Sequence, residues 1–179
     1  MLYYLSLGSN LGDRESTLRS ALQLIEQQIG SVLRCSSFYY SKPWGFTSQN
    51  DFCNLCCALE TDLPPLKVLH LTQTIERSLG RTQKTQINKH QISIRRSRSF
   101  DRREIRNLKC PIYSDRTIDI DLIRVFDDDG TEIKCQISNN TSPISNLKSQ
   151  MSSDTLLTLP HPLWRERDFV KVPLAEIMQ

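Results

Sequence analysis

Residues 118–123 constrain this chain most, because they alternate apolar and charged side chains with a period of two. This alternation predicts a β-strand with one face on a core and the other turned to a site or to solvent. Asp119 and Asp121 would share that second face, where like charges repel and aspartate is a poor strand former. A cation between the carboxylates would remove that cost, and Mg²⁺ suits hard carboxylate oxygens together with water and substrate phosphates.

A basic residue just before the strand strengthens this interpretation. Arg116 precedes Asp119 by three residues, so its guanidinium could lie against the same phosphates. The alternative is a solvated strand face, on which alternating charges are ordinary. The basic residue and the apolar face beneath the pair favour metal–phosphate chemistry over that alternative.

The length and composition predict one domain. The chain has 179 residues, with 38% hydrophobic residues and a mean hydropathy of −0.41, as in soluble globular proteins. No apolar run approaches the roughly 20 residues of a membrane helix. The first residues lack the basic start and small-residue cleavage site of a signal peptide. We interpret the six cysteines as reduced thiols and expect a cytoplasmic location without a membrane partner.

The charge is unevenly distributed. Residues 81–116 contain eleven Lys and Arg against three acidic residues, whereas the remainder has twelve basic and seventeen acidic residues. Such a segment indicates a polyanionic partner, which could be nucleotide phosphates, nucleic acid or another protein. For most of these charges we favour a solvated, mobile loop.

Apolar periodicity predicts strands at residues 2–7, 32–40, 52–60 and 118–126, and helices at 14–29 and 63–79. Asp13 and Asp62 are expected to cap the two helices, and residues 131–137 to form a short edge strand. The order β-α-β-β-α-β predicts an α+β, ferredoxin-like fold, in which an antiparallel sheet carries two helices on one face. Residues 81–116 would be a long basic loop insertion and residues 138–154 a flexible loop.

Three segments near the strand ends could carry function. Residues 8–12 lack the glycine and lysine pattern of a phosphate loop, so a tight connection is the favoured interpretation. Residues 41–51 form a long loop with two aromatic side chains. Phe52 and Asn54 share a strand face, where they could stack on a flat heterocycle and hydrogen-bond its edge. They could equally be a core Phe beside a capping Asn, and the spacing leaves both interpretations open.

A set of short motifs then points to a family. They are Gly8-Ser9-Asn10-Leu11-Gly12, Ser36-Ser37-Phe38-Tyr39, Asn54 followed by Ala58-Leu59-Glu60-Thr61, Gln73 with Glu76, Gly80-Arg81, Arg116-Thr117-Ile118-Asp119-Ile120-Asp121, Leu159-Pro160-His161-Pro162 and Pro173-Leu174-Ala175-Glu176-Ile177. Because it contains these motifs in this order, the chain resembles the 6-hydroxymethyl-7,8-dihydropterin pyrophosphokinases of folate biosynthesis. The resemblance implies that ATP gives its β,γ-pyrophosphoryl group to the pterin hydroxymethyl group and leaves as AMP.

The same resemblance implies the roles of individual residues. Asp119 and Asp121 would hold two Mg²⁺ ions, and Arg81 and Arg116 would join them as catalytic residues. The residues implied around ATP are Leu69, Gln73, Arg81, Arg116, Leu122, Thr158, His161 and Arg167, with Glu76 as a polar contact nearby. Those implied around the pterin are Ser41, Pro43, Trp44, Phe52, Asn54 and Phe169. The small-molecule substrates would be the partners, with fusion to or association with dihydropteroate synthase as a further expectation.

The chain departs from the family pattern in three ways. Gln83 stands where a second loop arginine is usual, and the long loop contains no tryptophan, for which Phe100 or Tyr113 could substitute. Leu156 and Pro162 replace an arginine and an aromatic residue that often contact the nucleotide. The sequence ends just after residue 177, where many members continue.

Three rival functions are less well supported. An RNA-binding module of the same β-α-β-β-α-β type would need a K/R-G-F/Y-x-F-like run on its third strand, which residues 52–58 lack. A D-x-D nucleotidyltransferase would need a preceding Gly-Ser at its usual spacing, and this is also absent. A catalytically inactive scaffold is disfavoured by the intact acid pair.

Overall fold

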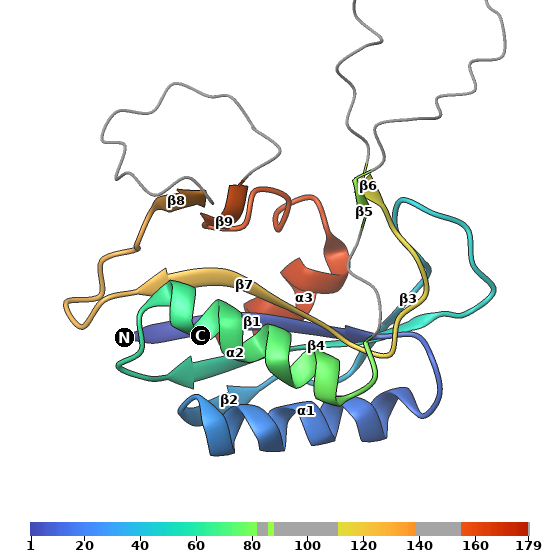
Figure 1. Cartoon of the computed structure of the whole chain (residues 1–179), viewed down its shortest axis with the longest axis horizontal. Coiled ribbons are helices and arrows are strands. Elements are labelled where there is room, and N and C mark those ends of the chain that lie inside the picture. Colours follow the sequence, from blue (N-terminus) through green and yellow to red (C-terminus); the bar gives the residue numbers. More distant parts are fainter. Residues whose placement is uncertain (82–85, 88–110, 139–154, 179) are drawn as a thin grey trace, which may run out of the picture.

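The computed structural model describes residues 1–81, 86–87, 111–138 and 155–178. An antiparallel sheet forms the centre of the molecule (Figure 1). Its middle strand is β1 (Leu2–Ser9), which lies between β4 (Phe52–Glu60) and β7 (Asp119–Phe126). Both β2 (Ser31–Cys35) and β3 (Tyr39–Ser41) pair with the outer edge of β4. The order β2-β4-β1-β7 confirms the predicted α+β architecture.

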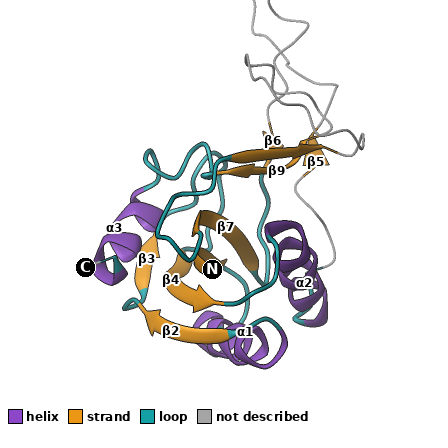
Figure 2. Ribbon diagram, turned by 90° about the vertical axis from the view of Figure 1, so that its left-hand side faces the viewer, coloured by secondary structure: helices purple, strands orange, loops and turns teal. Residues whose placement is uncertain are grey.

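Helices cover both faces of this sheet (Figure 2). The helices α1 (Arg14–Gln28) and α2 (Pro65–Ser78) pack on one face, as predicted. They bury a core to which β1 contributes Tyr3, Leu5 and Leu7. A third helix, α3 (Asp168–Ile177), which the sequence did not reveal, packs on the other face around Tyr4, Cys56 and Ile123.

Two predicted boundaries were wrong. The predicted strand 32–40 is divided into β2 and β3, because Ser36 bonds back to Cys56 and Ser37 turns its backbone N–H and hydroxyl to the Glu176 carboxylate of α3. Asp13 does cap α1, since its carboxylate accepts a hydrogen bond from Ser16 N at 3.1 Å. The N-cap of α2, in contrast, is Pro64 without a side-chain bond, and not Asp62. The two prolines fix the extended backbone that enters this helix.

Two further strand pairs lie beside the sheet (Figure 1). The predicted edge strand at 131–137 is replaced by β8 (Cys135–Ser138), which pairs with β9 (Thr155–Leu159) instead of the central sheet. A bridge between Phe126 and Glu132 and a hydrogen bond from Ile133 N to Val125 O at 2.8 Å connect the segment before β8 to β7. The strands β5 (Gln86–Ile87) and β6 (Pro111–Ile112) pair within the basic segment. Residues 82–85, 88–110 and 139–154 of the two predicted loops lie outside the described residues.

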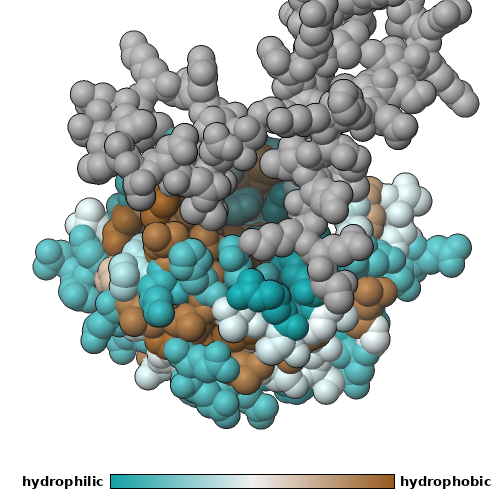
Figure 3. Space-filling view, viewed as in Figure 1, coloured by the Kyte–Doolittle hydropathy of each residue, from teal (hydrophilic) through white to brown (hydrophobic). Residues whose placement is uncertain are grey.

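The described surface is mixed in character. Figure 3 shows hydrophilic residues interspersed with smaller hydrophobic patches over the face that carries α1 and α2. Among the described helices, none has the length and apolar composition needed to cross a membrane.

Candidate active site

Strand register brings the main functional candidates to one face of the sheet. Gly8 of β1 lies opposite Asn54 of β4 and Asp119 of β7, and Ser6 lies opposite Asp121. Residues directly opposite in an antiparallel pair project from the same face. A pocket opens there, lined by Ser6, Gly8, Ser41, Lys42, Trp44, Phe46, Phe52, Asn54, Tyr113, Arg116, Asp119, Asp121, Arg167 and Phe169.

One end of the pocket has an amide set among aromatic rings. Asn54 is 3% exposed, and its amide nitrogen donates to Tyr39 O at 3.1 Å and to Ser41 Oγ at 3.0 Å. Its Oδ1 lies against Gly8, where an added Cβ would approach this oxygen to 2.9 Å. Phe52 is almost completely buried and meets Phe46 edge to face, with ring centroids 6.2 Å apart. The amide is thus held in one orientation beside an apolar wall.

The other end of the pocket has the two carboxylates. Arg81 Nη1 lies 2.5 Å from Asp119 Oδ1, and Arg116 Nε lies 3.3 Å from Asp119 Oδ2. The negative charge of Asp121 is compensated much less, since its ion-pair partner, Arg167 Nη1, lies 4.0 Å from Asp121 Oδ2. Burial and the negative charge of Asp119 accordingly raise the pKa of Asp121 to about 7.

This donor set fits a hard divalent cation. Two carboxylates share one strand face, and one of them lacks a close positive partner. Among the described residues, no third Asp, Glu, His or Cys joins them. Mg²⁺ commonly takes only one or two protein carboxylates and fills its remaining positions with water and substrate phosphates. The pair therefore suits Mg²⁺ bound together with a phosphorylated ligand.

Glu76 anchors Arg81 from the helix side. The same Arg81 Nη1 that reaches Asp119 also pairs with Glu76 Oε1. That oxygen accepts a hydrogen bond from Ile120 N at 2.7 Å, which ties α2 to the strand of the acid pair. Burial raises the pKa of Glu76 to about 7, against the opposing charge of Arg81. Arg81 is consequently fixed between two carboxylates.

Asn10 holds Arg116 from the turn that follows β1. Asn10 is 2% exposed; its Oδ1 accepts from Arg116 N at 2.8 Å, and its backbone N–H donates to Arg116 O at 3.2 Å. The guanidinium then lies over the rings of Phe52 and Tyr113, at 5.4 and 5.8 Å from their centroids. The turn is thus a connection, as expected, but one that positions a site residue.

Arg167 lies in an aromatic cage at the start of α3. Its guanidinium is 4.6 Å from the centroid of Trp44 and 5.8 Å from that of Phe169, and its Nη2 donates to the Tyr113 hydroxyl at 3.1 Å. The residue is only 7% exposed. Desolvation and the charge of Arg167 lower the pKa of His161 to about 4. His161 Nδ1 accepts from Leu163 N at 3.3 Å, so the neutral ring has its proton on Nε2.

The structure brings together most, but not all, of the predicted site residues. Arg81 adjoins the pocket, and the pterin set lines it except for Pro43, whose neighbours Lys42 and Trp44 take part. Of the residues predicted around ATP, Arg116 and Arg167 line the pocket. Five others lie outside the lining: Leu69, Leu122, Gln73, Thr158 and His161. Of these, Leu69 and Leu122 belong to the hydrophobic core beneath α1 and α2.

Several lining residues were not predicted. Ser6, Lys42 and Phe46 have no distinctive pattern in the sequence, and their role follows from strand register and loop path. Tyr113 was expected only as a substitute for an absent tryptophan. Its ring meets that of Trp44 edge to face, with the ring centroids 6.0 Å apart, and both side chains line the pocket. Phe100 and Gln83 lie outside the described residues.

Comparison with known proteins gives a consistent result. The model of the 7,8-dihydro-6-hydroxymethylpterin-pyrophosphokinase (HPPK) family matches residues 4–101 and 90–179. The 2-amino-4-hydroxy-6-hydroxymethyldihydropteridine pyrophosphokinase of Porphyromonas gingivalis is 36% identical, over 98% of this chain and 90% of that protein. The enzyme of the same name from Bacillus subtilis is 33% identical, over 98% of this chain and 77% of that protein.

A bifunctional relative and a solved structure are also similar to this chain. The bifunctional protein FolKE of Lactococcus lactis is 30% identical over 98% of this chain, which spans 37% of that protein. A crystal structure described as HPPK-DHPS in complex with substrates superposes with a TM-score of 0.58 at 13% identity. It covers 99% of this chain, which in turn spans 40% of it. At this identity the superposition supports the fold alone.

Proposed function

The chain belongs to the 7,8-dihydro-6-hydroxymethylpterin-pyrophosphokinase family, and we propose that the pocket between β1, β4, β7 and α3 is its active site. The reaction is the ATP-dependent transfer of a diphosphate group to the hydroxymethyl group of 6-hydroxymethyl-7,8-dihydropterin, a step of folate biosynthesis, with AMP as the second product. One observation carries the assignment to this pocket. Phe52 and Asn54 lie in the same cavity as Asp119 and Asp121.

The aromatic end of the pocket suits the pterin. A flat, fused heterocycle can stack on Phe52, Trp44 and Phe169, which line the cavity. Asn54 directs its amide nitrogen to Tyr39 and Ser41, so its Oδ1 is the atom that can accept an N–H from the ring edge. This arrangement favours a substrate with ring donors at one edge and its reactive arm directed to the carboxylates.

The carboxylate end suits the metal-bound triphosphate. We propose that Asp119 and Asp121 hold two Mg²⁺ ions there. When bound, Mg²⁺ would neutralise charge on the phosphate oxygens and bring them near the hydroxymethyl oxygen. Both carboxylates must be ionised for this role. The raised pKa of Asp121 means that its negative charge is unfavourable in the absence of a bound cation.

The arginines supply the remaining positive charge. Transfer of this kind depends mostly on positioning and on charge stabilisation, because little covalent chemistry is left to the protein. Arg81 and Arg116 already border Asp119, and Arg167 borders Asp121, so all three lie where phosphates would meet the carboxylates. Neutral His161, with its proton on Nε2, can donate to a phosphate oxygen without adding charge.

Two expectations remain proposals. Association with dihydropteroate synthase is suggested by the solved structure described as HPPK-DHPS, and the bifunctional relative FolKE supports the idea that a chain of this kind can be part of a larger protein. A cytoplasmic location is likewise proposed from the sequence alone.

The function is tested by mixing the protein with ATP, Mg²⁺ and 6-hydroxymethyl-7,8-dihydropterin and identifying the nucleotide formed. AMP that appears only with pterin, and in equal amount to a pterin diphosphate, is the expected result. ADP would mean transfer of a single phosphoryl group and would contradict the proposal.

A further inference from the structure

The Asp115 carboxylate connects three segments that are distant in sequence. Its Oδ1 accepts from Asn10 Nδ2 at 2.7 Å, and its Oδ2 accepts from Asn50 Nδ2 at 2.9 Å. Asn10 follows β1, Asn50 belongs to the loop of residues 42–51, and Asp115 itself precedes β7. Hydrogen bonds led by that from the Ser48 hydroxyl lower the pKa of Asp115, so the group is an ionised acceptor at neutral pH.

Asp115 fixes the orientation of the Asn10 amide. The two ends of an amide have nearly the same shape, but a carboxylate can only accept hydrogen bonds. With Asp115 on one side, Asn10 must turn Nδ2 toward the carboxylate and Oδ1 toward Arg116 N, where it accepts at 2.8 Å. The backbone of Arg116 is therefore held through an amide whose direction Asp115 determines.

The same carboxylate secures the loop that forms the aromatic wall. Residues 42–51 carry Trp44 and Phe46, both of which line the pocket. Asn50 attaches this loop to Asp115, and Asn10 Nδ2 also reaches Asn50 O at 3.4 Å. The pterin wall and the phosphate arginine are thereby joined through a single side chain.

We propose that Asp115 is a positioning residue, which holds Arg116 and the 42–51 loop in register so that the pterin pocket and the phosphate site form together. This inference rests on the proposed function, because it assigns the two joined parts to the two substrates. Asp115 itself touches neither substrate in this account.

Exchange of the two bonded side chains provides the test. In Asp115→Asn, one side-chain oxygen remains as acceptor, and the new NH₂ group faces a second donor. Asn50→Asp alone places two carboxylates together. In the double variant Asp115→Asn/Asn50→Asp, the new amide at position 115 can accept from Asn10 and donate to the new carboxylate at position 50. The link is then restored with reversed polarity.

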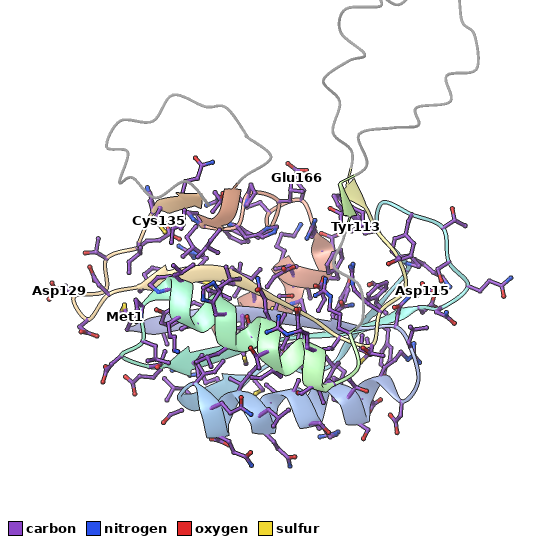
Figure 4. All side chains as sticks on the ribbon, in the orientation of Figure 1. Met1, Tyr113, Asp115, Asp129, Cys135 and Glu166 are labelled. Atoms are coloured by element: carbon purple, nitrogen blue, oxygen red, sulfur yellow. The ribbon has the colours of Figure 1, made fainter. Side chains whose placement is uncertain are left out.

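We expect Asp115→Asn to lower kcat/KM for the pterin about 10- to 100-fold, with both a higher pterin KM and a lower kcat, as for loss of a charged hydrogen bond. The double variant should recover most of this loss, so the two substitutions will be strongly non-additive. Asp129→Asn is the matched control, because Asp129 is exposed and lies at the opposite end of the molecule from Asp115 (Figure 4). It should leave kcat and KM unchanged.

Each result has a definite meaning. If the single variants lose only thermal stability and keep both kinetic constants, Asp115 is merely structural and the proposal is wrong. The same holds if the two substitutions are additive, since the link between residues 50 and 115 then plays no part. Failure of the wild-type protein to form AMP and pterin diphosphate would instead overturn the proposed function, so the two failures are distinguishable.

Discussion

Arg81 Nη1 lies 2.5 Å from Asp119 Oδ1 and bonds Glu76 with the same nitrogen, so the first carboxylate of the acid pair is also part of a buried ion network. Asp121 has no such role, since its only ion pair is at 4.0 Å among the described residues. The two carboxylates should therefore differ in their contribution to stability, although both are needed for turnover.

We predict that Asp119→Asn and Asp121→Asn each lower kcat at least about 1000-fold, because each removes a proposed metal ligand. Asp119→Asn should also lower the free energy of unfolding by about 1–3 kcal/mol, since Arg81 loses one charged partner. Asp121→Asn should cost little stability or even add some. Denaturant unfolding of the metal-free proteins measures this difference, and equal losses in both variants would contradict the network.

Phe52→Ala should weaken pterin binding about 10- to 100-fold, because the ring is a buried wall of the aromatic end. Binding of an ATP analogue should change much less. Calorimetric titration with each ligand measures both constants. Phe126→Ala, which removes a ring that packs on Tyr4 outside the pocket lining, is the control for a general loss of packing. An equal loss of affinity for both ligands would mean that Phe52 only packs in the core and does not contact the pterin.

Gly8→Ala should raise the pterin KM about tenfold, because the new Cβ would come within 2.9 Å of Asn54 Oδ1 and displace the amide that meets the ring edge. The KM for ATP should stay nearly constant. Steady-state kinetics with each substrate in turn tests this, and an unchanged pterin KM would show that Asn54 does not contact the substrate.

The pKa of His161, lowered to about 4 from its ordinary 6.5, predicts a pH-dependent contribution to stability. Between pH 6.5 and 4 the unfolded chain binds a proton at this residue and the folded chain does not, so stability falls as the pH decreases through this window. The contribution amounts to at most about 3 kcal/mol. The difference in unfolding free energy between wild type and His161→Gln, measured at about pH 7.5 and about pH 4.5, should narrow or reverse at the lower pH. A constant difference would contradict the lowered pKa.

The sequence predicted those parts of the site that depend on local periodicity. The alternation in residues 118–123 correctly indicated that Asp119 and Asp121 share a strand face, because a period of two is a property of the strand itself. The residues around the pterin and Arg167 were assigned through family resemblance, and the pocket brings all of them together except Pro43.

The parts that were missed depend on contacts across the chain. Asn10 bonds Asp115 over 105 residues, and although Asn10 belongs to the motif of residues 8–12, no local pattern connects it with Asp115. Gly30 follows α1, and a Cβ there would come within 2.2 Å of Glu60 O, so tertiary packing requires a glycine at this position. The helix α3 is short and contains Pro173, which obscures its helical pattern.

The central claim is that Asp119 and Asp121 together hold the metal ions, and Mn²⁺ binding tests it most directly. The protein is equilibrated with Mn²⁺ and a non-hydrolysable ATP analogue, separated from free ligand, and its bound manganese is counted by electron paramagnetic resonance after acid release. We predict about two Mn²⁺ per chain for the wild type and Asp129→Asn, and one or none for Asp119→Asn and Asp121→Asn. Unchanged manganese content in both acid-pair variants would contradict the account.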